Sequence, residues 1–448
     1  MGETVDDAWA EEQMPDTDNS NIDLDWLHQA VAGLFAGNRL TRKDNSGREW
    51  TYHAPSLGPF PGRYPHQWFW DSCAHAISLR HIDIRLACEE ITSLLAAQDE
   101  NGFIPHQVLN RARANFFDRI AAGVYPSRGH SPYLQAPVLA QAVQAIQVSS
   151  PEEGFLLTVL PCLKRYHHYL RRTRERSGDG LLEIIHSYES GKDRSREYDQ
   201  VYGQSLGVGL RAWPMIRLIL KHRFLGWDID RIFDSNAFRV KDLLFNCAYA
   251  GDLLAMATLC RDAGQPAEAE SFTRLLEQTE AGILGKMYDP ETGLFNSLDS
   301  RHGADGQIKV RTVSTFLPLL LGSISEGQVR RLLEELCDPS EYWLRFPVPA
   351  EPRNSPEAGR SRTGIWRGLQ TWIFMNWFIV RGLHRQAGRY PGLQAQCLGT
   401  AAELTRRTYQ LVRQSGFREY YDSDTGAGER AFAFGMSGLV LDMACMVR

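Results

Sequence analysis

The strongest constraint on the fold is a repeated unit of two amphipathic stretches that ends in a turn rich in Asp and Gly. Residues 239–263 and 267–285 carry apolar side chains at helical spacing, and a Tyr-Asp-x-x-Thr-Gly turn follows at 288–293. The same turn recurs at 421–426, and residues 99–103 are a looser copy. Because runs that alternate like strands are scarce, the repeat predicts an all-α chain of successive helical hairpins.

The domain organisation and charge narrow the class of protein. Residues 1–22 are acidic and polar, so we expect a disordered tail. No boundary divides residues 23–448, which we expect to form a single domain. A net charge of −5 argues against a nucleic-acid binder. The chain has neither an apolar run long enough to span a membrane nor a signal peptide, so we expect no membrane partner and a cytoplasmic location.

Metal and cofactor sites are not expected. The 8 cysteines include no Cys-x-x-Cys pair, and we interpret them as reduced core residues. His106 has no partner at metal-ligand spacing, and the adjacent His167 and His168 would point to different sides of a helix. The sequence therefore predicts no metal and no cofactor, and it leaves homo-oligomerisation open.

Carboxylates gather in the segment His186–Asp199, where Gly and Ser break the helical period and predict a loop. A solvated surface loop is one explanation for such a run of mixed charge. The other is that the loop follows the helical stretch 155–174 in order to present an acid to a sugar. Its acidic members are Glu189, Asp193, Glu197 and Asp199.

Two aromatic segments could bind a sugar. In the first, Trp68 and Trp70 can cover the apolar face of a pyranose, and Asp71 can accept hydrogen bonds from its hydroxyls. Core packing and helix capping are the alternative roles. In the second, Arg367 follows Trp366 and could hold an acidic group or form a structural ion pair.

Taken in order, these segments resemble glycoside hydrolase family 63, the family of the processing α-glucosidases. The nearest branch is that of the bacterial and plant enzymes that hydrolyse mannosylglycerate and glucosylglycerate. The chain keeps family motifs at Tyr64–Asp71, Phe103–His106, Gln135–Val138, Tyr188–Ser195, Trp366–Trp372 and Phe417–Tyr421. It departs from the family pattern at several positions, including Ala136, Lys192, Arg194, Ile365, Leu369 and the segment 432–437.

The resemblance implies an (α/α)6 barrel, a toroid of six helical hairpins. It also implies an inverting hydrolase for the α-glycosidic bond of a small glycoside such as glucosylglycerate or mannosylglycerate. Asp193 would be the general acid and Glu419 the general base. The substrate would be bound by Tyr64, Trp68, Trp70, Asp71, Gln135, Tyr188, Glu189, Trp366 and Arg367.

Two cations beside Asp193 could indicate the charge of the substrate's aglycone. Lys192 and Arg194 flank Asp193, so either both side chains point into solvent or one of them meets a negative group on the aglycone. Three other functions stay open: an α-glucosidase for neutral oligosaccharides, a sugar-binding protein without chemistry, and an epimerase-like protein. The epimerase needs a His pair that no ordered motif supplies, and a binding protein need not keep both carboxylates.

Overall fold

The computed structural model describes residues 22–447 except 45, 60–61, 117, 119–124, 126–128, 152, 207–208, 302, 357 and 359–364. The tail predicted at 1–22 lies outside these residues, apart from Ile22. The chain is mostly helical, as predicted. Its principal helices are α1 (Leu24–Asn38), α2 (Phe69–Leu79), α3 (Ile84–Leu95), α5 (Leu139–Ser149), α6 (Glu153–Arg174), α7 (Asp199–Tyr202), α8 (Trp213–Phe224), α9 (Ile229–Asp234), α10 (Leu243–Asp262), α11 (Pro266–Gly282), α12 (Glu326–Leu336), α13 (Ile373–Arg389), α14 (Gln394–Ser415) and α15 (Leu439–Met446).

The predicted hairpin at 239–285 is formed by α10 and α11. Asp242 caps α10 by accepting a hydrogen bond from the Phe245 amide, and residues 240–241 form a strand before it. Among the described helices, α10 is the one long and apolar enough to cross a membrane. Most of its side chains are buried inside the protein, which accounts for an apolar composition on every side.

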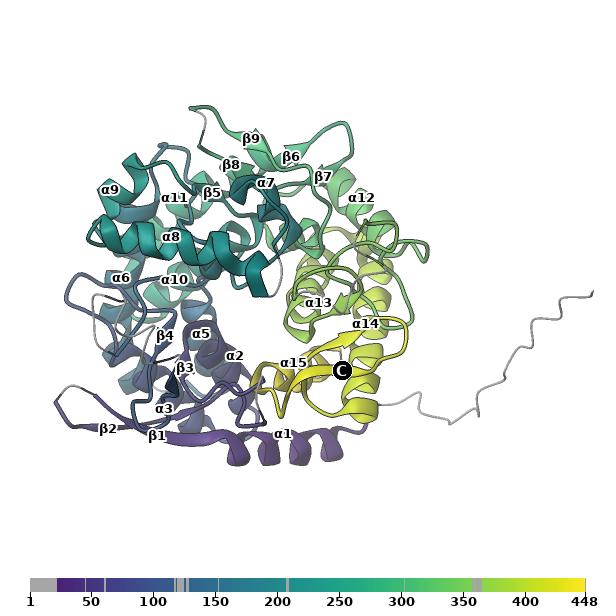
Figure 1. Ribbon diagram of the computed structural model, residues 1–448. Helices are drawn as coiled ribbons and strands as arrows, with labels where there is room; N and C mark the ends of the chain where they lie inside the picture. Colours follow the sequence, from purple (N-terminus) through teal and green to yellow (C-terminus); the bar gives the residue numbers. More distant parts are fainter. Residues whose placement is uncertain are drawn as a thin grey trace, which may run out of the picture.

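Helices that are distant in sequence form a closed ring. The short 3-10 helix η5 (Val313–Leu320) takes part in it. In the order α2, α5, α10, η5, α13 and α15, each element contacts the next, and α15 returns to α2. Figure 1 shows the chain following this ring from the purple N-terminal helices through teal and green to the yellow C-terminal ones. A continuous cluster of buried side chains runs through the ring elements.

The two ends of the ring are joined by hydrogen bonds. The Asn38 side-chain amide donates to the Ala433 carbonyl at 2.7 Å, and the Ser56 hydroxyl donates to the Phe432 carbonyl at 2.7 Å. The Gly435 amide donates to the Pro55 carbonyl at 2.8 Å. These contacts fix the C-terminal sheet against the segment that leads into α2.

Small antiparallel sheets connect the helices, which the all-α prediction did not include. Most of their strands are two residues long, too short to show an alternating pattern in the sequence. The sheets pair β1 (Arg39–Lys43) with β2 (Glu49–His53), β3 (Gln67–Trp68) with β4 (Gln107–Val108), and β6 (Tyr288–Asp289) with β7 (Leu294–Phe295). Two further sheets have three strands each. The strand order of one is β5 (Val240–Lys241), β8 (Leu298–Asp299), β9 (Gly306–Gln307). The strand order of the other is β10 (Gln370–Thr371), β11 (Arg418–Asp422), β12 (Gly428–Phe432).

Candidate active site

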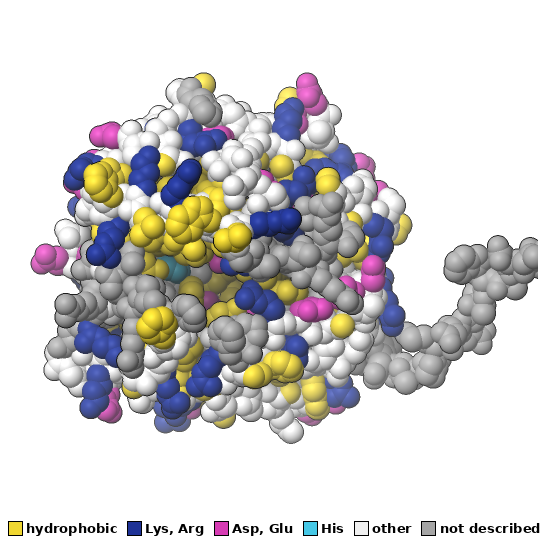
Figure 2. Space-filling model, in the orientation of Figure 1, with side chains coloured by type: hydrophobic (Ala, Val, Ile, Leu, Met, Phe, Trp, Pro, Cys, Tyr) yellow, Lys and Arg dark blue, Asp and Glu magenta, His cyan; other side chains and the backbone are white. Residues whose placement is uncertain are grey.

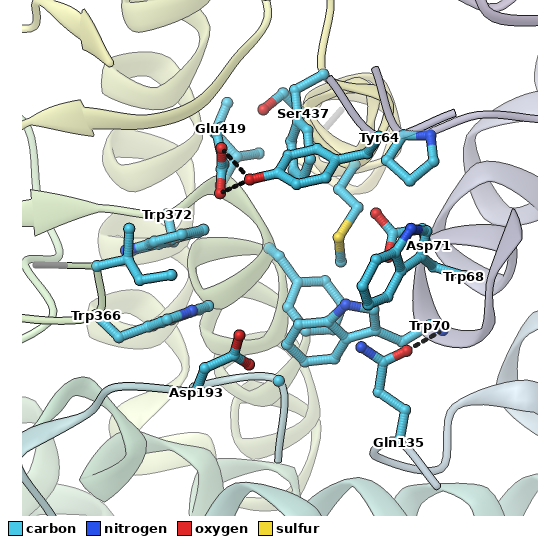
Figure 3. Close-up of a pocket in the computed structure, with 17 residues that line it drawn as sticks. Tyr64, Trp68, Trp70, Asp71, Gln135, Asp193, Trp366, Trp372, Glu419 and Ser437 are labelled. Carbon is cyan, nitrogen blue, oxygen red and sulfur yellow. Dashed lines mark hydrogen bonds between the residues drawn. The ribbon is translucent and has the colours of Figure 1, made fainter. Parts of the chain in front are cut away.

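A pocket collects side chains from both halves of the chain. Figure 2 shows that this face of the molecule is hollowed at its centre, and Figure 3 shows the residues that line the pocket. The residues predicted from sequence that line it are Tyr64, Trp68, Trp70, Asp71, Gln135, Asp193, Trp366 and Glu419. The lining is completed by Pro55, Gly191, Ile365, Trp372, Ile373, Phe374, Phe434, Met436 and Ser437.

Asp193 is held by a loop built from two short 3-10 turns, η1 (Ser187–Ser190) and η2 (Arg196–Tyr198). His186 caps the first turn, and Ser195 caps the second by accepting from the Glu197 amide. Between the turns, Gly191 has a φ of +75°, and a Cβ there would lie 2.2 Å from the Trp70 ring. A glycine is therefore required for this loop to pack against Trp70.

Burial sets the protonation of Asp193. Loss of solvent raises the pKa of this carboxyl to about 7, although the nearby Arg194 and Arg430 guanidinium groups oppose the rise. Desolvation acts in this direction because it disfavours the charged form. Asp193 is thus protonated over much of the range below neutral pH, which is the state that a proton donor needs.

Glu419 lies on β11 and is almost fully buried. The Tyr64 hydroxyl donates to it and lies 3.2 Å from both carboxylate oxygens. Arg430 Nη1 donates to Oε1 at 3.5 Å, and the Ala431 amide donates to Oε2 at 3.3 Å. Burial raises the pKa of Glu419, and the Arg430 charge and these hydrogen bonds oppose the rise. The bonds orient the carboxylate and favour its ionised form.

A third carboxyl, Asp71, lines the pocket from the first turn of α2. Helix α2 begins at Phe69 without a side-chain cap, so Asp71 does not have the capping role. Burial raises the pKa of Asp71 to about 8, with Glu419 and Glu90 adding to the rise. Beside it, Gln135 accepts a hydrogen bond from the Trp70 amide at 3.0 Å through its side-chain oxygen.

An aromatic wall closes one side of the pocket. The rings of Trp366 and Trp372 are stacked, with centroids 3.8 Å apart and planes 5° apart, and Tyr420 packs on Trp372. Trp366 has a φ of +63°, an unfavourable value for a bulky residue that occurs most often at functional sites. Figure 3 shows this wall across the pocket from Trp68 and Asp71. Two opposed apolar surfaces of this kind suit the two faces of a sugar ring.

Three of the predicted site residues lie outside the pocket lining. Glu189 is fully buried and accepts hydrogen bonds from Arg174 and from the amides of Leu134 and Ile185, so it anchors the loop that carries Asp193. Tyr188 packs among the rings of other aromatic residues, namely His106, Tyr133 and His186. Arg367 forms an ion pair with Asp199, with Nη1 3.0 Å from Oδ2.

Lys192 does not take either of the positions expected for it. Its side chain is buried, and its ammonium group donates to Glu197 and to the Ser314 hydroxyl and lies 3.1 Å from Asp242. The expectation that it faces solvent or substrate was wrong because buried carboxylates surround it. Arg194 is half-buried, and among the described residues nothing accepts a hydrogen bond from its guanidinium.

Arg430 and Trp372, the second half of the aromatic wall, line or adjoin the site although the sequence did not predict them there. Trp372 belongs to a segment that the family motif already contained, so that signal was present. Phe434, Met436 and Ser437 belong to the segment that departs from the family pattern. Among the described residues, no group of three His, Cys, Asp or Glu side chains is arranged to hold a metal ion.

The chain is similar in sequence to glycoside hydrolases named for mannosylglycerate or glucosylglycerate. The sequence model of the mannosylglycerate hydrolase MGH1-like glycoside hydrolase domain matches residues 64–437. The mannosylglycerate hydrolase of Thermus thermophilus is 29% identical over 415 residues, which cover 85% of this chain and 94% of the relative. The glucosylglycerate hydrolase of Mycolicibacterium hassiacum is 27% identical over 392 residues, 77% of this chain and 87% of that protein.

Among solved structures, the chain is similar to the GH63 mannosylglycerate hydrolase from Thermus thermophilus in complex with Tris and D-glycerate. The TM-score is 0.78 at 25% sequence identity, and the match covers 94% of this chain and all of the other.

Proposed function

The chain belongs to the mannosylglycerate hydrolase MGH1-like glycoside hydrolases, and we propose that it cleaves the α-glycosidic bond of a small glycoside with inversion. Asp193 acts as the general acid and Glu419 as the general base. The observation that supports these roles is the placement of the two carboxyls on opposite sides of one pocket (Figure 3), one with a pKa of about 7 and the other held by donors.

In this mechanism, Asp193 gives its proton to the departing glycosidic oxygen. Glu419 takes a proton from a water molecule, which attacks the anomeric carbon from the face opposite the leaving group. The products are the free alcohol and a sugar of β configuration. A separation of roughly 6.5–9.5 Å between the carboxyl groups is what an inverting enzyme requires, since the water must fit between base and substrate.

Some of the predicted site residues would contact the sugar, and others hold the pocket lining in place. Trp68, Trp70 and the Trp366–Trp372 wall supply apolar surface, while Asp71 and Gln135 supply hydrogen-bonding groups. The loop and the sheet that carry the lining residues are held in place by Glu189, Tyr188 and Arg367, which do not contact the sugar themselves. The same arrangement supports a single (α/α)6 barrel over residues 23–448, with the ring of contacting elements as its inner wall.

Arg194 favours an anionic aglycone. Its guanidinium lowers the pKa of Asp193 by its charge, so it acts on the acid directly. A negative group on the substrate would offset that charge once bound and would let Asp193 keep its proton. A glycerate carboxylate is such a group, and the names of the relatives that hydrolyse mannosylglycerate and glucosylglycerate agree with it. Neutral α-linked oligosaccharides are the second candidate class.

The proposed function is tested by comparing kcat/KM for glucosylglycerate, mannosylglycerate, glucosylglycerol and maltose. The sugar released first should be the β-anomer by NMR, and the two glycerate substrates should be preferred. Arg194→Gln should reduce that preference. Arg196→Gln is the matched control, because this cation of the same loop is paired with Glu351 at 2.8 Å. An α-anomer released first excludes inversion, and equal rates on charged and neutral compounds exclude the anionic aglycone.

A further inference from the structure

The strand pair that carries Glu419 contains a β-bulge opposite this residue. Arg418 pairs with Phe432, but Tyr420 pairs with Glu429, so the single residue Glu419 faces two residues, Arg430 and Ala431. A bulge of this kind redirects side chains and is common beside active sites. Here its two residues reach the two carboxylate oxygens separately, Arg430 Nη1 at Oε1 and the Ala431 amide at Oε2.

The bulge requires an unfavourable backbone. Arg430 has a φ of +54°, in the left-handed region that a residue with a Cβ rarely occupies. Strain of this kind persists only where the surrounding structure holds it, and it gathers at sites where it serves function. Glycine would adopt the same backbone without strain, so the arginine side chain is the feature that needs an explanation.

We propose that Arg430 is a positioning residue for the general base, which holds the Glu419 carboxylate in its orientation and keeps it ionised. This inference rests on the role proposed for Glu419. It adds a residue that the catalytic motifs do not contain. The guanidinium is mostly buried, with 28% of the side chain exposed, so its charge is only partly screened by solvent.

The other groups that face Glu419 are neutral donors or acids. Tyr64 donates from the segment before β3, and the Ala431 amide donates from β12. The carboxyl of Asp71 on α2 and that of Asp193 on the loop between η1 and η2 face it as potential negative charges. Among these described groups, Arg430 is the one positive charge. Without it, an ionised Glu419 would face two other acids with neutral donors alone.

The test is the pH profile of kcat/KM for Arg430→Gln, Arg430→Gly and Arg430→Lys. Since the base must be ionised, activity rises as pH rises through the Glu419 pKa. Removal of the cation raises that pKa, so the acidic limb should move upward by roughly half a pH unit to one unit in the Gln and Gly variants. The Lys variant should restore most of the shift. Both Arg430→Gln and Arg430→Gly remove the cation, but only glycine also relieves the left-handed backbone, so the melting temperature of Arg430→Gly should exceed that of Arg430→Gln.

Arg418→Gln is the matched control on the same strand pair. Its guanidinium lies over the Phe432 ring and donates to the Gly428 carbonyl, so the acidic limb should stay in place. An acidic limb at the wild-type position in both the Gln and Gly variants overturns the proposal. A changed preference between glucosylglycerate and glucosylglycerol with an unmoved limb also overturns it, since Arg430 would then bind substrate. Retained activity in Glu419→Gln would instead overturn the assignment of the base.

Discussion

Lys192 and Asp193 are adjacent in the chain, but their side chains serve different parts of the molecule. Asp193 lines the pocket, whereas the Lys192 ammonium lies in the core between Glu197 and Asp242. One peptide bond thus connects the proposed acid to a buried ion cluster that anchors its loop. The cluster fixes where the loop passes the pocket, and Asp193 projects from that fixed backbone.

Lys192→Met should therefore destabilise the protein without changing its substrate preference. The substitution leaves buried carboxylates without their cation, which costs about 3–5 kcal/mol of unfolding free energy. Urea denaturation measures this loss, and the ratio of kcat/KM for glucosylglycerate over glucosylglycerol should equal that of wild type. A lower ratio at unchanged stability would place Lys192 at the aglycone after all.

Asp193→Asn and Glu419→Gln should each remove most of the turnover. Each isosteric change deletes one proton transfer, and such a transfer contributes about a hundred- to ten-thousand-fold to rate. Single-turnover kinetics on the preferred glycoside measures the loss. The melting temperature should stay near wild type, because each change keeps the size and shape of the side chain. Near-native turnover in either variant would remove that residue from the mechanism.

The alkaline side of the pH profile should report Asp193. The acid must be protonated, so kcat/KM should fall as pH rises through the Asp193 pKa of about 7. Arg194 lowers this pKa by its charge, so Arg194→Gln should move the alkaline limb to higher pH. Profiles measured on a neutral substrate isolate this effect from binding. A limb that moves to lower pH would contradict the sign of the interaction.

Gly191→Ala should impair catalysis more than an equally strained substitution elsewhere. A Cβ at Gly191 would meet the Trp70 ring, whereas Gly203, with a φ of +74°, has open space around its Cβ position. Both changes carry the backbone cost of a left-handed residue, about 1–2 kcal/mol. The additional loss of kcat/KM in Gly191→Ala measures how strongly the loop depends on Trp70. Equal losses in both variants would show that this contact does not position the site.

Much of the fold and part of the site could be predicted from sequence. The helical periodicity of residues 239–285 predicted the α10–α11 hairpin. The motifs predicted that Asp193, Glu419 and Trp70 belong to one site, and all three line the pocket. Glu189 was predicted to bind substrate because it lies in the same charged loop as Asp193, and only the structure shows that it is buried and anchors the loop, whereas Asp193 lines the pocket.

The remaining differences follow from tertiary structure. Two-residue strands such as β10 are too short to carry a pattern. The bulge at Arg430 depends on the register of β11 with β12, and no local sequence signal fixes that register. The partners of Lys192 come from the loop that carries Asp193, from the start of α10 and from η5, so its burial could be known only from their packing.

The hydrogen bonds that join Asn38 and Ser56 to the β12 segment connect residues 395 and 376 positions apart, so they can form only after most of the chain has been synthesised. A ribosome-bound chain from which β11 has not yet emerged can already contain Asp193 and the hairpins around it, but it lacks Glu419, the proposed base. Helix pairs close over short sequence separations and form early, whereas contacts between the two ends of a chain form late. Hydrolysis should therefore begin only when the ring closes, and in refolding the helical signal should return before the activity does.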